Sequence, residues 1–281
     1  MSQREYPPQM KPPRQDIAAP PLPVGARWIG GEEAAMERLT DAGPVLVNFF
    51  DFAQLNSVRT LPYLGAWHRR YAGAGLTVLG VHTARFPFSE DPAVVETAVE
   101  RLEIPYPVVV DEQRAAWAAY GCHGWPSLFL WSRGGALSWY HFGEGDYLAT
   151  EEAIQEQLGD VLGSPLEPVE PMRPGDAPGA GVIPPTPELL PGGSEREPWR
   201  SSSEEPALEV SFEAAGAWAS LDGVGELAVD LDGSVLQTVV VEAPGLYQLT
   251  PEGPHASHRL VLRPGPELAI YSLSFAVGVP G

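Results

Sequence analysis

Short apolar runs alternate with helical periodicities through the middle of the chain. Residues 44–50 (PVLVNFF) and 76–82 (LTVLGVH) are continuous apolar runs, which are typical of buried strands. Between such runs, apolar positions recur every three or four residues, and Asp91 before Pro92 is a helix-start signal. The pattern predicts strands at 44–50, 76–82, 107–110, 127–131 and 136–142, and helices at 56–73, 91–102, 112–120 and 150–162.

The order of these elements indicates an α/β fold. Strands that alternate with helices are joined by crossovers, so the first three strands are expected to run parallel. The last two strands flank Arg133-Gly134-Gly135, a hairpin signal, so they are expected to pair antiparallel. We expect this α/β domain to span residues 28–162.

Residues 206–281 carry a different pattern. Short runs of strand-forming residues recur, and turn signals such as Asp222-Gly223 and Asp232-Gly233 separate them. This spacing predicts a small antiparallel β-sandwich. The predicted strands are 208–212, 226–231, 235–241, 246–249, 259–262 and 269–277.

Two proline-rich segments border these regions. Residues 1–27 hold seven prolines and predict an extended or disordered arm, and residues 161–204 hold ten prolines and six glycines. Because proline removes backbone donors, we interpret residues 163–205 as a linker between two domains. Four apolar residues of this linker are candidates for docking on a domain surface: Val182, Ile183, Leu189 and Leu190.

Charge and cysteine content exclude several function classes. The chain has 17 basic and 37 acidic residues, a net charge of −20, which argues against nucleic acid and anionic membranes as partners. No apolar run approaches a membrane-spanning length and no export signal is evident, so we expect a cytoplasmic protein. Cys122 is the single cysteine, so neither an intrachain disulfide nor a Cys-rich zinc site can form. We expect no metal and no other cofactor.

Residues 45–64, VLVNFFDFAQLNSVRTLPYL, resemble the active-site segment of the redoxin group of thioredoxin-like proteins. The segment is most similar to the soluble part of DipZ-type membrane fusions, which reads Asp-Phe-Trp, then Cys-x-x-Cys, then Arg-Thr-Leu-Pro-Tyr-Leu. Similar pieces follow in the same order at 80–83, 104–108, 119–121, 125–126 and 141–147. The resemblance covers about residues 22–162 and implies a thioredoxin-like fold. A weaker resemblance at 246–249 and 269–275 implies the β-sandwich that follows in those fusions.

The resemblance also locates the redox positions. Thiol–disulfide exchange needs a low-pKa thiolate at a helix start and a second thiol three residues later. These positions fall at Gln54 and Ser57, the buried proton acceptor falls at Asn48, and a further carboxylate falls near Arg85. Because all four are altered while the apolar scaffold is kept, we interpret the chain as a redoxin-family protein without redox function. It is expected to act as a non-catalytic scaffold or protein-binding module.

Cys122 leaves an enzymatic alternative open. It lies four residues before Pro126, on the approach to the loop that faces the active-site helix in the implied fold. In one interpretation it is the nucleophile of a thiol-dependent oxidoreductase or peroxidase. In the other it is a small, half-buried apolar residue. Glu144 and Asp146, which lie two residues apart, are interpreted as structural residues of a loop.

Two regions are candidate binding sites. Trp125-Pro126 matches the cis-proline loop of thioredoxin-like proteins, where it would border, with Phe52 and Gln54, a groove for a protein or peptide partner. The alternative is a turn that only the fold requires. In the sandwich, four aromatic residues form either a face for a carbohydrate or protein ligand or part of the core: Trp218, Tyr247, Tyr271 and Phe275.

Overall fold

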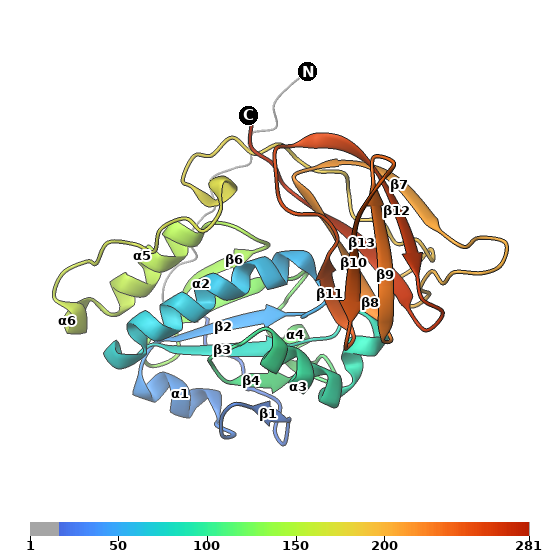
Figure 1. The fold of residues 1–281 in the computed structure, drawn as a ribbon. Helices are drawn as coiled ribbons and strands as arrows, with labels where there is room; N and C mark the ends of the chain where they lie inside the picture. Colours follow the sequence, from blue (N-terminus) through green and yellow to red (C-terminus); the bar gives the residue numbers. More distant parts are fainter. Residues whose placement is uncertain (1–16, 281) are drawn as a thin grey trace.

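The computed structural model describes residues 17–280, so residues 1–16 of the predicted arm lie outside the described residues. The first part of the chain forms a six-stranded sheet in the order β1-β4-β3-β2-β5-β6 (Figure 1). β2, β3 and β4 run parallel, whereas β1, β5 and β6 run antiparallel to their neighbours. The strands are β1 (Trp28–Ile29), β2 (Val45–Phe50), β3 (Thr77–His82), β4 (Val108–Val110), β5 (Ser127–Trp131) and β6 (Leu137–Phe142).

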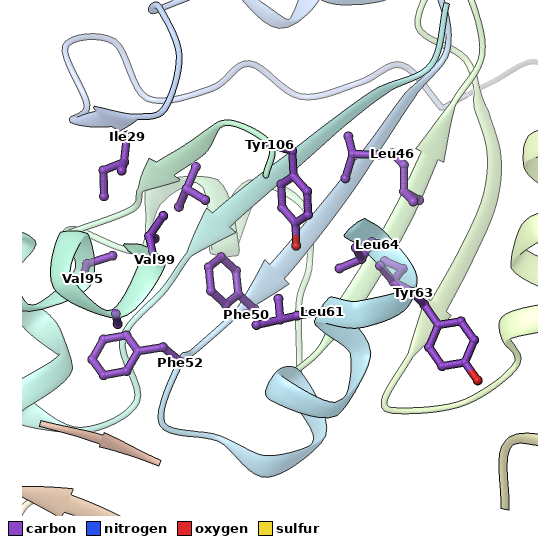
Figure 2. Packing of buried hydrophobic residues seen from close by; sticks show 14 of the residues in the cluster. Ile29, Leu46, Phe50, Phe52, Leu61, Tyr63, Leu64, Val95, Val99 and Tyr106 are labelled. Carbon is purple, nitrogen blue, oxygen red and sulfur yellow. The ribbon is translucent and has the colours of Figure 1, made fainter. Parts of the chain in front are cut away.

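Helices cover both faces of this sheet because its central strands are apolar on both sides. α2, α3 and α5 pack on one face, where Phe50 of β2 lies beneath Leu61 of α2 (Figure 2). α1 and α4 pack on the other face, around Phe49. The helices are α1 (Met36–Ala42), α2 (Leu55–Tyr71), α3 (Pro92–Arg101), α4 (Ala115–Ala119), α5 (Tyr147–Gln157) and α6 (Gly159–Leu162), with short 3₁₀ turns η1 (Ala72–Ala74), η2 (Pro87–Glu90) and η3 (Pro174–Asp176). This arrangement confirms the predicted thioredoxin-like fold.

The second part of the chain is a sandwich of two antiparallel sheets, as predicted. One sheet has the order β10-β9-β12-β7 and the other the order β11-β8-β13. Their facing side chains form a separate core around Phe212, Leu260 and Leu273. The strands are β7 (Leu208–Ala214), β8 (Gly216–Asp222), β9 (Gly225–Leu231), β10 (Ser234–Val241), β11 (Gly245–Gln248), β12 (Ala256–Pro264) and β13 (Ala269–Ala276).

The sequence prediction missed β1, α1 and β8. β8 consists mainly of small residues (GAWASLD) without a period-two pattern, yet all but its last residue are buried. The sheet that contains it packs on the other sandwich sheet and also on the α/β domain. Trp218 of β8 belongs to one apolar cluster with Leu55, and the ring of Tyr271 lies 5.4 Å from Phe86 and 5.0 Å from Phe88. Burial on both faces removes the alternation that identifies a strand in sequence.

The proline-rich segment between the two parts lies along their surface. We call residues 183–199 the strap. The strap pairs with the end of the chain through three isolated bridges: Ile183 with Gly278, Leu189 with Leu273, and Trp199 with Ile270. Leu190 packs against the α/β core. Of the four apolar residues predicted to dock, only Val182 does not, since its side chain is 48% exposed.

Residues 17–22 are extended and packed on the α/β domain. Ala18 bridges Ala136, and Leu22 is buried. Within residues 17–280, no helix combines the length and apolar character that crossing a bilayer requires.

Candidate functional site

Two polar side chains lie at the start of α2, at the positions where the resemblance places redox thiols. Gln54 is the N-cap residue, and its side-chain oxygen accepts a hydrogen bond from the Ser57 backbone N–H at 2.9 Å. The Ser57 hydroxyl is buried and accepts a hydrogen bond from the Asp51 N–H at 3.3 Å. Pro62 lies inside the helix. Gln54 therefore caps the helix, while Ser57 ties the first turn of the helix to the loop that precedes it.

A buried carboxylate, that of Asp51, lies in the loop just before this helix start. Asp51 is fully buried and accepts hydrogen bonds from the Ala53 N–H at 2.7 Å, the Arg85 N–H at 2.5 Å and the Ser89 hydroxyl at 2.8 Å. Burial alone raises the pKa of Asp51, but nearby His82 and the two N–H donors lower it by more, so its pKa lies below the usual range. Asp51 thus holds together the segments that follow β2 and β3.

Asn48, at the predicted proton-acceptor position, is fully buried in β2. Neither side-chain atom of its amide has a hydrogen-bond partner among the described residues. An amide accepts no proton at ordinary pH, so this position offers no base for thiol chemistry.

The start of α2 is covered by other parts of the chain. A hollow of about 370 Å³ beside Gln54 is lined by residues of the strap, including Pro187, and by β13 residues, including Phe275. The Ser220 hydroxyl of β8 donates a hydrogen bond to the Ala53 carbonyl at 2.6 Å. The sandwich and the strap therefore lie against the start of α2, beside Gln54 (Figure 1).

Arg85 fixes the strap on this face. It stands near the position where the resemblance places a carboxylate, and its guanidinium pairs with Glu188 at 2.7 Å and Glu195 at 2.9 Å. Burial alone lowers the pKa of Arg85, but the two strap carboxylates raise it by more. A cation here gives the acidic strap a docking partner, which the sequence analysis did not recognise.

The residues that were predicted to border the groove differ in their environments. The Trp125–Pro126 peptide bond is cis, as the resemblance implies. Trp125 is half-buried against Trp117, and its indole N–H donates a hydrogen bond to the Thr83 carbonyl at 2.8 Å. Phe52, which was predicted to border the groove, is 1% exposed. Its ring stacks on the buried side chain of His82.

Cys122 lies in an environment that suppresses thiol reactivity. The side chain is 6% exposed and belongs to the apolar cluster around Phe49. Burial raises the pKa of the Cys122 thiol to about 12, which leaves almost no thiolate at neutral pH. The structure favours the interpretation of Cys122 as a buried apolar residue.

A charged network that the sequence analysis missed ties α2 to the sandwich. Arg59 is 6% exposed and donates hydrogen bonds to Glu144 at 2.7 Å and to Glu252 at 2.5 Å. Arg173, just after the α/β domain, lies 3.3 Å from Glu144 and 3.0 Å from Asp176. Glu144 is thus structural, as predicted. The cluster joins three parts of the chain, with partners up to 193 residues apart.

The sandwich aromatics do not form an open stacking face. Trp218, Tyr271 and Phe275 are each less than 10% exposed, and Phe275 stacks on Phe212 in the core at 4.8 Å. Tyr247 is half-buried beneath the guanidinium of Arg101. This packing supports the interpretation of these four aromatic residues as part of the sandwich core and not as a face for a ligand. Within the part of the chain that the structure describes, no group of three or more His, Cys, Asp or Glu side chains could hold a metal ion.

Replacing both caps tests the assignment of the redox positions. In a Cys122→Ser background, we expect Gln54→Cys with Ser57→Cys to form a disulfide under mild oxidation, because the two positions lie one helical turn apart. Mass spectrometry should show the loss of two protons. The matched pair Gln54→Cys with Asn56→Cys, which lies on different sides of the helix, should keep free thiols. Free thiols in both variants would show that the register is wrong.

Comparisons with known proteins agree with the fold. No protein-family model matches the chain. Protein DipZ of Mycobacterium tuberculosis is 27% identical over 267 residues, which cover 82% of this chain and 38% of DipZ. NHL repeat-containing protein 2 of Homo sapiens is 31% identical over 133 residues, which cover 47% of this chain and 18% of that protein. The chain therefore spans well under half the length of these curated relatives.

Solved structures with similar folds are small thioredoxin-like proteins. Thioredoxin-like superfamily protein SPOA0173 is 24% identical with a TM-score of 0.47, and the match covers 51% of this chain and 97% of that structure. A thiol-disulfide isomerase from Corynebacterium glutamicum is 22% identical with a TM-score of 0.43, covering 52% and 98%. The strand order from β1 to β6 and the cis Trp125–Pro126 bond give the first part of the chain a thioredoxin-like fold, and most of the chain is similar in sequence to DipZ.

Proposed function

We propose that this protein is a non-catalytic thioredoxin-like scaffold that presents its β-sandwich to a protein partner. The observation that carries the proposal is the start of α2. Gln54 and Ser57 there bond backbone N–H groups, Ser57 is buried, and the strap and β13 line the hollow beside the half-buried Gln54. A redox site needs two thiols and access for a substrate disulfide, and neither condition is supported at this helix start.

The interface between the two parts supports a scaffold role. Apolar contacts through Trp218 and Tyr271, the buried Arg59 network and the Arg85 contacts to the strap fix the sandwich on the α/β domain. Interfaces of this kind resist relative domain motion when they are large and apolar. The α/β domain then sets the orientation in which the sandwich meets a partner.

The rival proposal is a thiol-dependent oxidoreductase that uses Cys122. Burial of this side chain and its raised pKa both oppose this role. The nearby negative charge of Asp111 raises the pKa of the Cys122 thiol further.

An insulin-reduction assay with dithiothreitol distinguishes the two proposals. We expect the protein to leave the rate of insulin precipitation equal to that of dithiothreitol alone, because no second thiol is present to resolve a mixed disulfide. Cys122→Ser should behave identically. An ordinary thioredoxin in the same assay is the positive control. Acceleration that disappears in Cys122→Ser would overturn the scaffold proposal in favour of the enzyme.

A further inference from the structure

The sandwich has two edge strands in its four-stranded sheet, and they differ in protection. β7 carries Glu209 and Glu213 on its exposed side, and the strap covers part of it through hydrogen bonds between Thr186 and Glu213. Charged side chains and covering segments are the usual means by which proteins block pairing at a sheet edge. β7 is therefore a protected edge.

β10 lacks both kinds of protection. Its sequence, SVLQTVVV, has no charged residue, and it pairs with β9 on one side only. Val235 is 80% exposed, Leu236 40% and Val240 59%. A register shift beside Leu236 leaves Gln237–Val241 as the regular stretch of the strand. An uncharged, β-branched edge of this kind is a template for adding a further strand.

Exposed acidic residues lie at one end of this strand. Glu242 follows β10 and Glu226 lies on β9 opposite Val240, whereas the Asp232 carboxylate is turned toward β12, where it pairs with His258 and accepts a hydrogen bond from the Arg259 N–H. If two copies paired through antiparallel β10 strands, each acidic edge would be brought against a second acidic chain. Like charges at such positions destabilise strand pairing, and the net charge of −20 adds repulsion between copies.

We propose that the β10 edge binds an extended segment of a partner protein that has β-branched residues in its centre and basic residues at its ends. The backbone of this segment would pair with Gln237–Val241, and in either strand direction one of its basic ends would face Glu226 and Glu242. The inference names the partner class for the proposed scaffold function. Its test is independent of the insulin assay, because strand addition does not depend on thiol chemistry.

The test uses a fluorescent peptide, acetyl-Lys-Thr-Val-Thr-Val-Thr-Lys-amide, with the full-length protein. We expect saturable binding by anisotropy, with NMR shift changes concentrated in β10. The same peptide N-methylated at alternate residues should lose binding, because it cannot pair through its backbone. A peptide with Glu in place of both Lys should bind at least tenfold more weakly at low salt, and this difference should shrink at high salt.

Matched variants locate the site. Val240→Lys places a repelling charge on the β10 edge and should weaken binding of the basic-ended peptide at least tenfold. Val224→Lys adds the same charge at a 49% exposed position in the β8–β9 turn and should change binding less than twofold. Equal effects of the two variants, equal binding of the N-methylated peptide, or no binding at all would overturn the proposal. A dimer through β10, seen by sedimentation and removed by Val240→Lys, would also overturn it in favour of a second copy.

Discussion

Replacing Arg59 with methionine is expected to destabilise the protein by about 3 kcal/mol, because the change leaves a buried carboxylate without its main partner. Arg59 and Glu144 are both largely buried, with side-chain exposures of 6% and 16%. Burial already raises the pKa of Glu144 in the native protein even though Arg59 and Arg173 lie beside it. Chemical denaturation monitored by tryptophan fluorescence measures the change.

Two further variants identify the cause of this loss. Arg59→Lys keeps the charge but supplies one compact donor group in place of the planar fork, so we expect an intermediate destabilisation. Arg259→Met removes a surface pair with Glu209, in which both side chains are more than half exposed, and should change the free energy of unfolding little. If Arg59→Met and Arg259→Met were equally stable, the Arg59 network would not fix the interface.

Asp51→Asn is expected to cost about 3 kcal/mol at neutral pH, since hydrogen bonds to a buried charged acceptor are stronger than those to a neutral one. The carboxylate accepts from Ala53, Arg85 and Ser89, and an amide in its place would turn its own N–H₂ toward one or more of these donors. Denaturation midpoints of the two proteins measure the loss.

The pH dependence gives this prediction a second readout. The pKa of Asp51 is lowered in the folded protein, so its stabilising contribution is present above the unfolded pKa of about 3.9 and is lost as pH falls through the folded value. The stability difference between the native protein and Asp51→Asn should therefore narrow below about pH 4. Charge repulsion from the other acids affects both proteins alike. A difference that stays constant down to acid unfolding would mean that folding does not lower the pKa of Asp51.

Much of the α/β domain could be predicted from the sequence because its signals are local. β2 and β3 are continuous apolar runs, and the helix start at Gln54 and the hairpin at Gly134 depend on neighbouring residues. The motif located the two redox positions at the helix start. The residue types there, Gln54 and Ser57, then predicted that these side chains cannot exchange disulfides. Burial of Phe52 was not predictable in the same way, because a motif gives a residue's position without its exposure.

The covered state of the helix start could not be predicted because it depends on contacts between distant segments. Arg59 and Glu252 are 193 residues apart, and Arg85 meets Glu188 across 103 residues. Proline content correctly indicated that the strap contains no regular helix, yet gave no information on what it contacts. β8 escaped prediction for a related reason, since the α/β domain buries its second face.

The central claim is that the strap and β13 cover the start of α2, and thiol labelling tests it most directly. A single thiol is placed by Gln54→Cys in a Cys122→Ser background, and its reaction with a bulky polyethylene-glycol maleimide is timed under native conditions. The matched control is Val224→Cys in the same background, at an exposed turn. We predict labelling at position 54 at least about tenfold slower than at position 224, because the strap and β13 line the hollow beside position 54 and restrict the approach of a bulky reagent. Equal labelling rates in two folded variants would contradict the account, since they would show an open site at the helix start.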